Sequence, residues 1–230
     1  MVNIFDRAKQ LTSVDMYKQA DPEPFILKNY YDLEFPSLSQ YVLRMLVKTP
    51  MSEIQIPAQL RWVQNYVQYC QDAHNEMFPK HCFTYLTIRH GTPIMGTDDQ
   101  WHVDGFSMKF PHLPEQNFFW CDHTPPEFAL SNFSIPSSFD PLKDNIHSFF
   151  GEALKNDVPI YQPPAGAISI FDPYLVHRKV KQPHRRSMIR ITFVPILIED
   201  DDNSVNSLIP VQKFNRSGKE YRENLRTDWF

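Results

Sequence analysis

The segment Gln100-Trp-His102-Val-Asp104 places an imidazole and a carboxylate two residues apart in the chain. On an extended segment, side chains two residues apart point to the same side, so both groups can reach one point. Iron(II) accepts both ligand types, and a second histidine would complete a facial set of three with open positions left on the metal. A His-x-Asp pair alone is a weak signal in a chain with 9 histidines. The third ligand must therefore come from another part of the chain.

A candidate for that ligand is His177, which lies 75 residues after His102 and opens a predicted strand. A further strand follows it, and Arg186, Arg190 and Thr192 share one face of that strand. Two cations on an otherwise apolar inner face are costly to bury without an anionic partner. A dicarboxylate could supply that partner through a bidentate pair with arginine.

Three segments, HVDG, FDPYLVHRKV and RRSMIRITF, together resemble the iron(II)- and 2-oxoglutarate-dependent dioxygenase superfamily. That family has His-x-Asp, a distal histidine, and an arginine roughly ten residues later that begins the last strand of the barrel. The resemblance covers about residues 81–197. It implies that His102, Asp104 and His177 are the iron ligands.

The same resemblance leaves two arginines as candidates for the distal carboxylate of 2-oxoglutarate. Arg186, nine residues after His177, is the preferred one. Arg190, thirteen residues after it, forms an Arg-x-Thr pattern with Thr192 that is similar to the family's Arg-x-Ser. The implied activity uses Fe(II), 2-oxoglutarate and O2, with ascorbate as a possible reductant. It hydroxylates a C–H bond and releases succinate and CO2, and formaldehyde is lost when the hydroxylated carbon sits on nitrogen or oxygen.

Five further residues are weaker candidates, each with an ordinary structural role as the alternative. Tyr85 and Thr124 are candidate contacts to 2-oxoglutarate, because relatives place polar residues at similar points. Trp101, Trp120 and Arg89 are candidates for the wall of the substrate pocket. For Trp101 and Trp120 a place in the hydrophobic core is an equally good interpretation.

The elements that must position these residues are helices first and strands afterwards. Helical spacing predicts helices at Ile4–Gln19, from Ser37 or Ser39 through Leu46, from Pro57 to Phe78, and from Pro141 to Leu154. β-Branched and aromatic runs predict strands at residues 24–29, 81–89, 101–110, 116–122, 127–130, 158–162, 167–171, 176–181 and 187–197.

This order of elements is not a βαβ alternation, so a parallel doubly wound sheet is not expected. The better match is a mostly β fold with flanking helices, namely a double-stranded β-helix of the jelly-roll or cupin-like type. We expect one oxygenase domain over residues 1–230. Residues 1–80 would be a helical N-terminal support, 81–197 the double-stranded β-helix core, and 198–230 a polar C-terminal extension with a solvated acidic run.

Composition sets the broad class of protein. Hydrophobic residues make up 42% of the chain, enough for a sizeable core. The net charge of -4 gives no broad basic face for nucleic acid. The 3 cysteines are too few and too far apart for a disulfide scaffold. The sequence contains no signal peptide and no stretch long enough to span a membrane, so we expect a cytoplasmic protein.

Two other functions are compatible with parts of the pattern. A cupin-like metalloenzyme without 2-oxoglutarate would explain the histidines and Asp104, but it would leave Arg186 and Arg190 without a purpose. A non-catalytic jelly-roll binding module would not need an intact ligand set. Within the oxygenase interpretation the substrate is a small molecule or is amino-acid-like, a peptide or nucleobase remains open, and the oligomeric state cannot be predicted.

Overall fold

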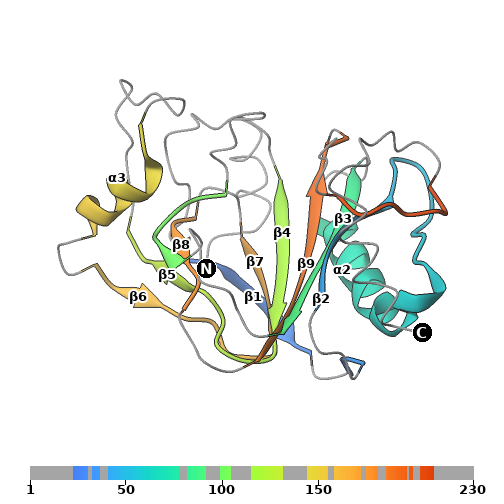
Figure 1. Cartoon of the computed structure of the whole chain (residues 1–230), viewed down its shortest axis with the longest axis horizontal. Coiled ribbons are helices and arrows are strands. Elements are labelled where there is room, and N and C mark those ends of the chain that lie inside the picture. The colour runs from blue at the N-terminus through green and yellow to red at the C-terminus, as the bar shows by residue number, and fades with distance from the viewer. Residues whose placement is uncertain are drawn as a thin grey trace.

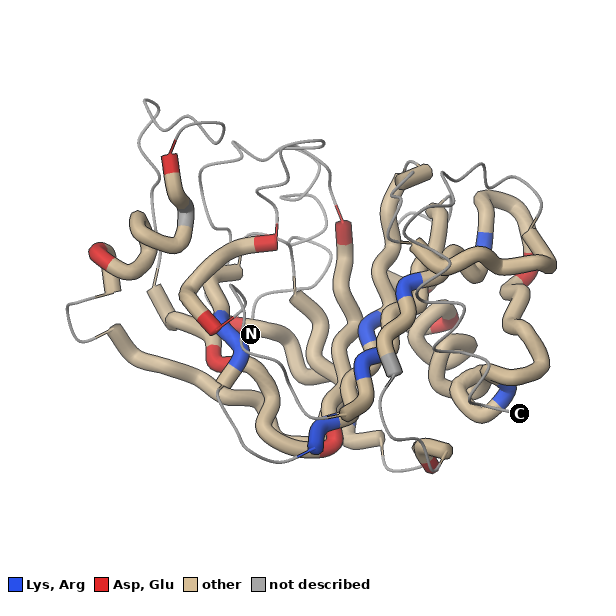
Figure 2. Tube along the Cα trace, viewed as in Figure 1, with Lys and Arg blue, Asp and Glu red and all other residues tan. Residues whose placement is uncertain are grey.

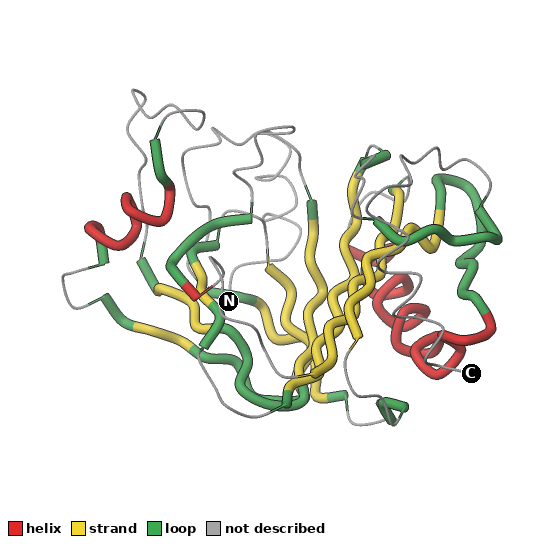
Figure 3. Tube along the Cα trace, viewed as in Figure 1, coloured by secondary structure: helices red, strands yellow, loops and turns green. Residues whose placement is uncertain are grey.

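The structure, a computed structural model, describes residues 23–30, 33–36, 41–77, 82–91, 99–104, 115–131, 144–154, 158–171, 175–180, 185–195, 197–198 and 203–209. The helix expected at Ile4–Gln19 lies outside these residues. The described part is mostly β, with two antiparallel sheets and a few helices (Figure 3).

Six strands form the larger sheet, in the order β1-β7-β4-β9-β3-β2. Their bounds are β1 Phe25–Asn29, β7 Ala167–Phe171, β4 Gln116–Cys121, β9 Arg186–Val194, β3 Phe83–Gly91 and β2 Tyr41–Lys48. Strand β9 pairs with β3 on one side and with β4 on the other. Its residues alternate between the two faces of the sheet. Ile189 and Ile191 belong to the core on one face, so Arg186 and Arg190 project from the other.

The smaller sheet has three strands in the order β6-β5-β8. Their bounds are β6 Ile160–Tyr161, β5 Glu127–Ala129 and β8 His177–Arg178. His102 forms an isolated antiparallel bridge with His177. The segment that carries His102 therefore adjoins the β8 edge. A longer strand is expected there at residues 101–110, but residues 105–110 lie outside the described part.

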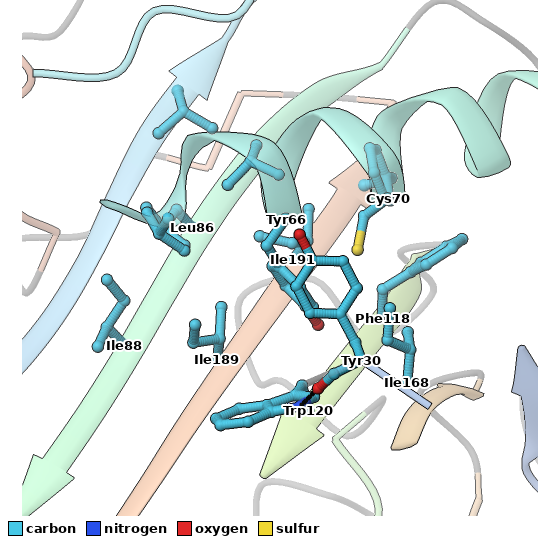
Figure 4. Close-up of a cluster of buried hydrophobic side chains, with 14 of the residues drawn as sticks. Tyr30, Tyr66, Cys70, Leu86, Ile88, Phe118, Trp120, Ile168, Ile189 and Ile191 are labelled. Atoms are coloured by element: carbon cyan, nitrogen blue, oxygen red, sulfur yellow. Dashed lines mark hydrogen bonds between the residues drawn. The ribbon is translucent and has the colours of Figure 1, made fainter. Parts of the chain in front are cut away.

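The helix expected from Pro57 to Phe78 is confirmed as a 3-10 turn, η1 (Ala58–Val63), followed by α2 (Gln64–Met77). Its buried stripe includes Val63, Tyr66, Val67 and Cys70. These side chains pack against Leu86, Ile88, Phe118, Ile189 and Ile191 from the larger sheet (Figure 4). Burying this apolar stripe holds the helix against one face of the sheet and leaves the opposite face for the site.

Helix α3 (Ile146–Ala153) lies on the outer side of the smaller sheet. Its N-cap is Asn145, whose side chain accepts hydrogen bonds from the backbone N–H groups of His147 and Ser148. Phe150 of this helix packs against Val103, Ala129 and Val176. The layers therefore run from α2 through the larger sheet and the smaller sheet to α3, an arrangement consistent with a β-sandwich (Figure 1).

The helix predicted through Leu46 is wrong, because Tyr41–Lys48 form strand β2. Leu43, Met45 and Val47 face the α2 side. On the opposite face Leu46 is buried in a separate cluster, while Val42 is exposed. Apolar residues on both faces break the strict period of two that marks a strand, and they also match helical spacing. The start expected at Ser37 or Ser39 lies outside the described residues.

The described part of the C-terminal segment, residues 203–209, packs against β2 with several of its polar side chains buried. Ser204 bridges to Met45 of β2 in parallel orientation. The Asn206 side-chain amide donates to the carbonyl oxygens of Leu46 and Gln55, at 2.9 and 2.8 Å. Ile209 is buried beside Leu46. Residues 203–209 therefore form a strap along β2, while the acidic run at 199–202 lies outside the described part.

In the described part of the chain, no helix combines the length and the apolar character that crossing a membrane requires.

Candidate metal centre

Three side chains converge between the two sheets: His102, Asp104 and His177. One potential ligand atom from each lies within 4.8 Å of the other two. The distance from Asp104 Oδ1 to His102 Nε2 is 4.0 Å, as is the distance from Asp104 Oδ2 to His177 Nε2. Ligand atoms lie roughly 2 Å from a bound metal ion, so small side-chain rotations would bring all three onto one ion. The structure thus brings together the ligand set that the sequence predicts.

Backbone pairing sets the separation of the two histidines. Each donates its backbone N–H to the carbonyl oxygen of the other, at 2.9 Å. Facing residues of an antiparallel pair project their side chains to the same side, and the two imidazole centroids lie 4.5 Å apart. Asp104 follows two residues after His102 and points to the same side.

Backbone carbonyls also orient both imidazoles. His102 Nδ1 lies 2.7 Å from the Gln100 carbonyl oxygen, and His177 Nδ1 lies 2.8 Å from the Leu175 carbonyl oxygen. A carbonyl can only accept a hydrogen bond, so each Nδ1 carries the proton and each Nε2 presents its lone pair. Metal-binding histidines are commonly oriented by such a second contact.

The charge states of the group also suit a divalent cation. Burial by itself raises the pKa of Asp104, but Arg190, the two imidazoles and Arg89 outweigh it and lower that pKa to about 2. Burial lowers the pKa of His177, although the Asp104 carboxylate opposes the shift. At neutral pH the site therefore offers an ionised carboxylate and a neutral His177. A two-histidine, one-carboxylate donor set fits iron(II).

Arg190 forms an ion pair with the ligand carboxylate itself. Its Nη1 lies 2.7 Å from Asp104 Oδ2, and both side chains are about three-quarters buried. Its Nε is buried and has no hydrogen-bond partner among the described residues. Arg190 is thus engaged at Asp104. Figure 2 shows Lys and Arg positions gathered along β2, β3 and β9 of the larger sheet.

Arg186 occupies a different environment on the same face of β9. Its side chain is 8% exposed, and its Nε donates to the Cys121 sulfur at 3.1 Å. The guanidinium carbon lies 5.9 Å from the centre of the Phe119 ring. Among the described residues, no carboxylate forms an ion pair with it. Within the described part of the chain, this deeply buried cation therefore has no anion that would compensate its desolvation.

A cluster of buried apolar side chains connects the candidate metal ligand His177 with Arg186. The cluster contains Phe119, Cys121, Phe128, Phe171, Leu175 and Met188. The His177 ring lies 5.6 Å from the Phe171 ring, which lies 6.2 Å from the Phe119 ring. A path of aromatic contacts therefore leads from the candidate metal ligands to the buried cation.

The remaining co-substrate candidates are Tyr85, Thr192 and Thr124. The Tyr85 hydroxyl accepts a hydrogen bond from the Ile198 N–H at 2.8 Å and donates to the Ile198 carbonyl at 3.1 Å. The hydroxyl thus uses its donor and one acceptor position at Ile198, and its role at 2-oxoglutarate stays a prediction. The Thr192 hydroxyl donates to Asn117 Oδ1 at 2.9 Å. Thr124 lies half-buried in the turn after β4, with a positive φ of 38°.

The two tryptophans face away from the site and pack with hydrophobic clusters, which favours the core alternative over a place in the pocket wall. Trp120 lies in the core on the α2 side of the larger sheet, and its indole N–H donates to the Tyr30 carbonyl at 2.9 Å. Trp101 packs with the α3 cluster, under the Arg178 guanidinium at 4.3 Å from the ring centre. Arg89 is exposed on β3, and its charge acts on Asp104.

Sequence reasoning missed two residues near the ligands. Burial, followed by the Asp104 charge, raises the pKa of Glu115, while the Arg190 charge lowers it. Glu115 also accepts a hydrogen bond from Asn117 at 2.9 Å. The ring of His147 on α3 lies 5.6 Å from the His102 ring, although His147 is outside the three-ligand group. Neither residue belongs to a local motif, so only the folded chain reveals its position.

No protein-family model matches the sequence, and no curated protein matches it. The chain is similar to the solved crystal structure of EvdMO1, with 16% sequence identity and a TM-score of 0.38. The match covers 84% of this chain and 42% of EvdMO1, so the chain spans well under half the length of that protein. At this TM-score the likeness carries no conclusion about fold or function.

Proposed function

We propose that the protein is an iron(II)- and 2-oxoglutarate-dependent oxygenase that hydroxylates a C–H bond of a small-molecule or amino-acid-like substrate. The observation that carries this proposal is the convergence of His102, Asp104 and His177 within 4.8 Å. Two imidazoles and one carboxylate hold three positions of an iron(II) ion and leave the others open.

The bound iron would supply activation of dioxygen, so that one oxygen atom enters the substrate C–H bond and the other enters succinate as 2-oxoglutarate loses CO2. The chain's own residues prepare the site. The Gln100 and Leu175 carbonyls fix the two imidazoles with Nε2 inward. Asp104 remains ionised because of the positive charges around it.

The environment of Arg186 supports a place for 2-oxoglutarate. A dicarboxylate with one end at the metal needs a cation for its far carboxylate and apolar contact for the methylenes between. Arg186 provides the buried cation, and the cluster around Phe119 and Phe171 provides the apolar wall. Because Arg190 is engaged with Asp104, we assign the far carboxylate to Arg186.

Chain topology supports a double-stranded β-helix as the finer description of the fold. Eight segments follow one another in the chain, namely β3, the His102 segment, β4, β5, β6, β7, β8 and β9. In the larger sheet four of them are neighbours in the order β3-β9-β4-β7. In the smaller sheet the order is β6-β5-β8, with the His102 segment next to β8. Two antiparallel layers of four segments each match a jelly roll.

A single oxygenase domain over residues 1–230 is part of the proposal. The packing of α2 on the larger sheet and of residues 203–209 along β2 supports it. A cytoplasmic location also remains a proposal, supported by three free, buried cysteines.

Equilibrium binding of 2-oxoglutarate tests the proposal without knowledge of the substrate. Anaerobic protein would be loaded with Fe(II) and dialysed against labelled 2-oxoglutarate, with metal-free protein and His177→Ala in parallel. We expect stoichiometric binding that requires the metal and is lost in His177→Ala. Metal uptake without any binding of 2-oxoglutarate would instead favour a cupin-like metalloenzyme, and absence of metal uptake would favour a binding module.

A further inference from the structure

Arg190 holds one oxygen of the candidate ligand Asp104. Its Nη1 lies 2.7 Å from Asp104 Oδ2, which also lies 4.0 Å from His177 Nε2, while Asp104 Oδ1 lies 4.0 Å from His102 Nε2. Arg190 lies in the middle of β9, opposite Thr87 of β3 and Phe119 of β4. A residue paired on both sides has little freedom to move its backbone, and the ion pair with Asp104 holds the guanidinium beside the candidate ligand.

Glu115 is the countercharge on this side of the site. Its carboxyl group interacts electrostatically with both Arg190 and Asp104. Its Oε1 accepts a hydrogen bond from Asn117, whose own Oδ1 accepts one from Thr192. Arg190 therefore lies in the field of two carboxylates, only one of which belongs to the three-ligand group.

A fixed positive charge next to a ligand acts more strongly on the oxidised form of a metal, which carries one more unit of charge. The effect is larger where side chains are mostly buried and the local dielectric constant is low. Hydrogen bonds to ligands and nearby charges are among the means by which a protein sets a metal's reduction potential. A guanidinium in contact with Asp104 therefore favours Fe(II) over Fe(III).

We propose that Arg190 is a positioning residue that keeps Asp104 Oδ1 free for the metal and, through its charge, stabilises the ferrous state. This inference rests on the proposed function, since it requires iron at the three-ligand group. It gives Arg190 a role separate from the one assigned to Arg186. An oxygenase of this class needs its iron ferrous before each reaction with dioxygen, so a residue that favours Fe(II) would protect the resting enzyme.

The test is the Fe(III)/Fe(II) reduction potential of the full-length protein, measured anaerobically by mediated titration without 2-oxoglutarate. Four variants would be compared with wild type after iron content and circular dichroism are checked. Arg190→Gln removes the charge and Arg190→Lys keeps it. Glu115→Gln removes the countercharge. Arg185→Gln removes an exposed arginine that contacts His90 and not Asp104.

We expect Arg190→Gln to shift the equilibrium at least tenfold toward Fe(III), which is about 59 mV for one electron. Arg190→Lys should recover most of the shift, and Arg185→Gln should match wild type. Glu115→Gln should not lower the potential, because it removes a negative charge. Damage to the fold would instead move Arg190→Gln and Glu115→Gln in the same direction.

Two results would overturn this inference and leave the proposed function standing. One is an unshifted reduction potential in Arg190→Gln, and the other is a parallel fall of that potential in Arg190→Gln and Glu115→Gln. A wild-type chain that takes up no iron would remove the proposed function, and this inference with it. The two failures are therefore distinguishable.

Discussion

His102 and His177 exchange both of their backbone hydrogen bonds, each at 2.9 Å. The pair of imidazoles is therefore held by strand pairing before any metal binds. Their Nδ1 atoms are held in turn by the carbonyls of Gln100 and Leu175. A preformed pair predicts that ligand variants lose metal without losing the fold.

The first prediction separates the metal ligands from a neighbouring histidine. His102→Ala should reduce Fe(II) or Co(II) affinity by at least about a hundredfold, because it removes one of three donors. Loss of a contact that only orients a ligand typically reduces metal affinity by up to about a hundredfold. His147→Ala, whose ring lies 5.6 Å from the His102 ring, should retain the metal. Equal loss in both variants would point to a site with more histidine ligands, as in the cupin-like alternative.

A second prediction concerns the two arginines on β9. Arg186→Ala should weaken 2-oxoglutarate binding by roughly thirtyfold or more, the loss expected for one partner of a buried charge pair. Arg190→Ala should weaken it less, because Arg190 contacts Asp104. Anaerobic dialysis of the iron-loaded variants measures both constants. The reverse order would move the carboxylate site to Arg190.

Protonation of the buried His74 should link the stability of the fold to pH. Its ring stacks 3.9 Å from Phe193 and contacts Gln116. Burial lowers the pKa of His74 to about 4, with the Gln116 hydrogen bond opposing the shift. The unfolded chain, with a pKa near 6.5, binds a proton before the folded one does. Stability should therefore fall as pH drops from about 6.5 to 4, by roughly 2–3 kcal/mol.

His74→Phe isolates this contribution, because the new ring can still stack on Phe193. Urea unfolding at a series of pH values should show a smaller loss of stability below pH 6.5 in this variant than in wild type. His123→Gln, at an exposed position, should leave the wild-type profile unchanged. An unaltered pH dependence in His74→Phe would show that His74 is not responsible.

The juxtaposition of His102, Asp104 and His177 was predictable because two of them share a short motif and the third follows an apolar strand. The helix at residues 57–78 was predictable for a similar reason, since its apolar stripe is long and regular. Strand β2 was not, because Val42 and Leu46 add apolar residues to the face opposite α2, and the strand therefore lacks the strict period of two.

The sequence also could not predict which side chains of a strand face the site. Trp120 and Phe119 are adjacent, yet one packs toward α2 and the other lies under Arg186. Which of two alternating faces turns toward a site depends on register, and register is set by pairing with distant strands. The same holds for Glu115 and Arg190, which interact across two segments that lie far apart in the sequence.

The strap at residues 203–209 provides a stability prediction. Asn206→Ala removes the donor to the Leu46 and Gln55 carbonyls and the acceptor for the Leu208 N–H. Leaving such groups unsatisfied should cost about 2–3 kcal/mol, measured by urea unfolding. Ser207→Ala, at the exposed neighbouring position, should change stability by less than about 0.5 kcal/mol. Equal values for the two variants would mean that the strap contributes little.

The central claim is that His102, Asp104 and His177 support an oxygenase reaction with 2-oxoglutarate, and succinate formation tests it most directly. Anaerobically purified protein would be loaded with Fe(II), mixed with 2-oxoglutarate and exposed to air, with and without ascorbate. We predict slow succinate formation that requires iron and oxygen and is abolished in His177→Ala. Absence of succinate, together with absence of 2-oxoglutarate binding to the iron-loaded protein, would contradict the claim.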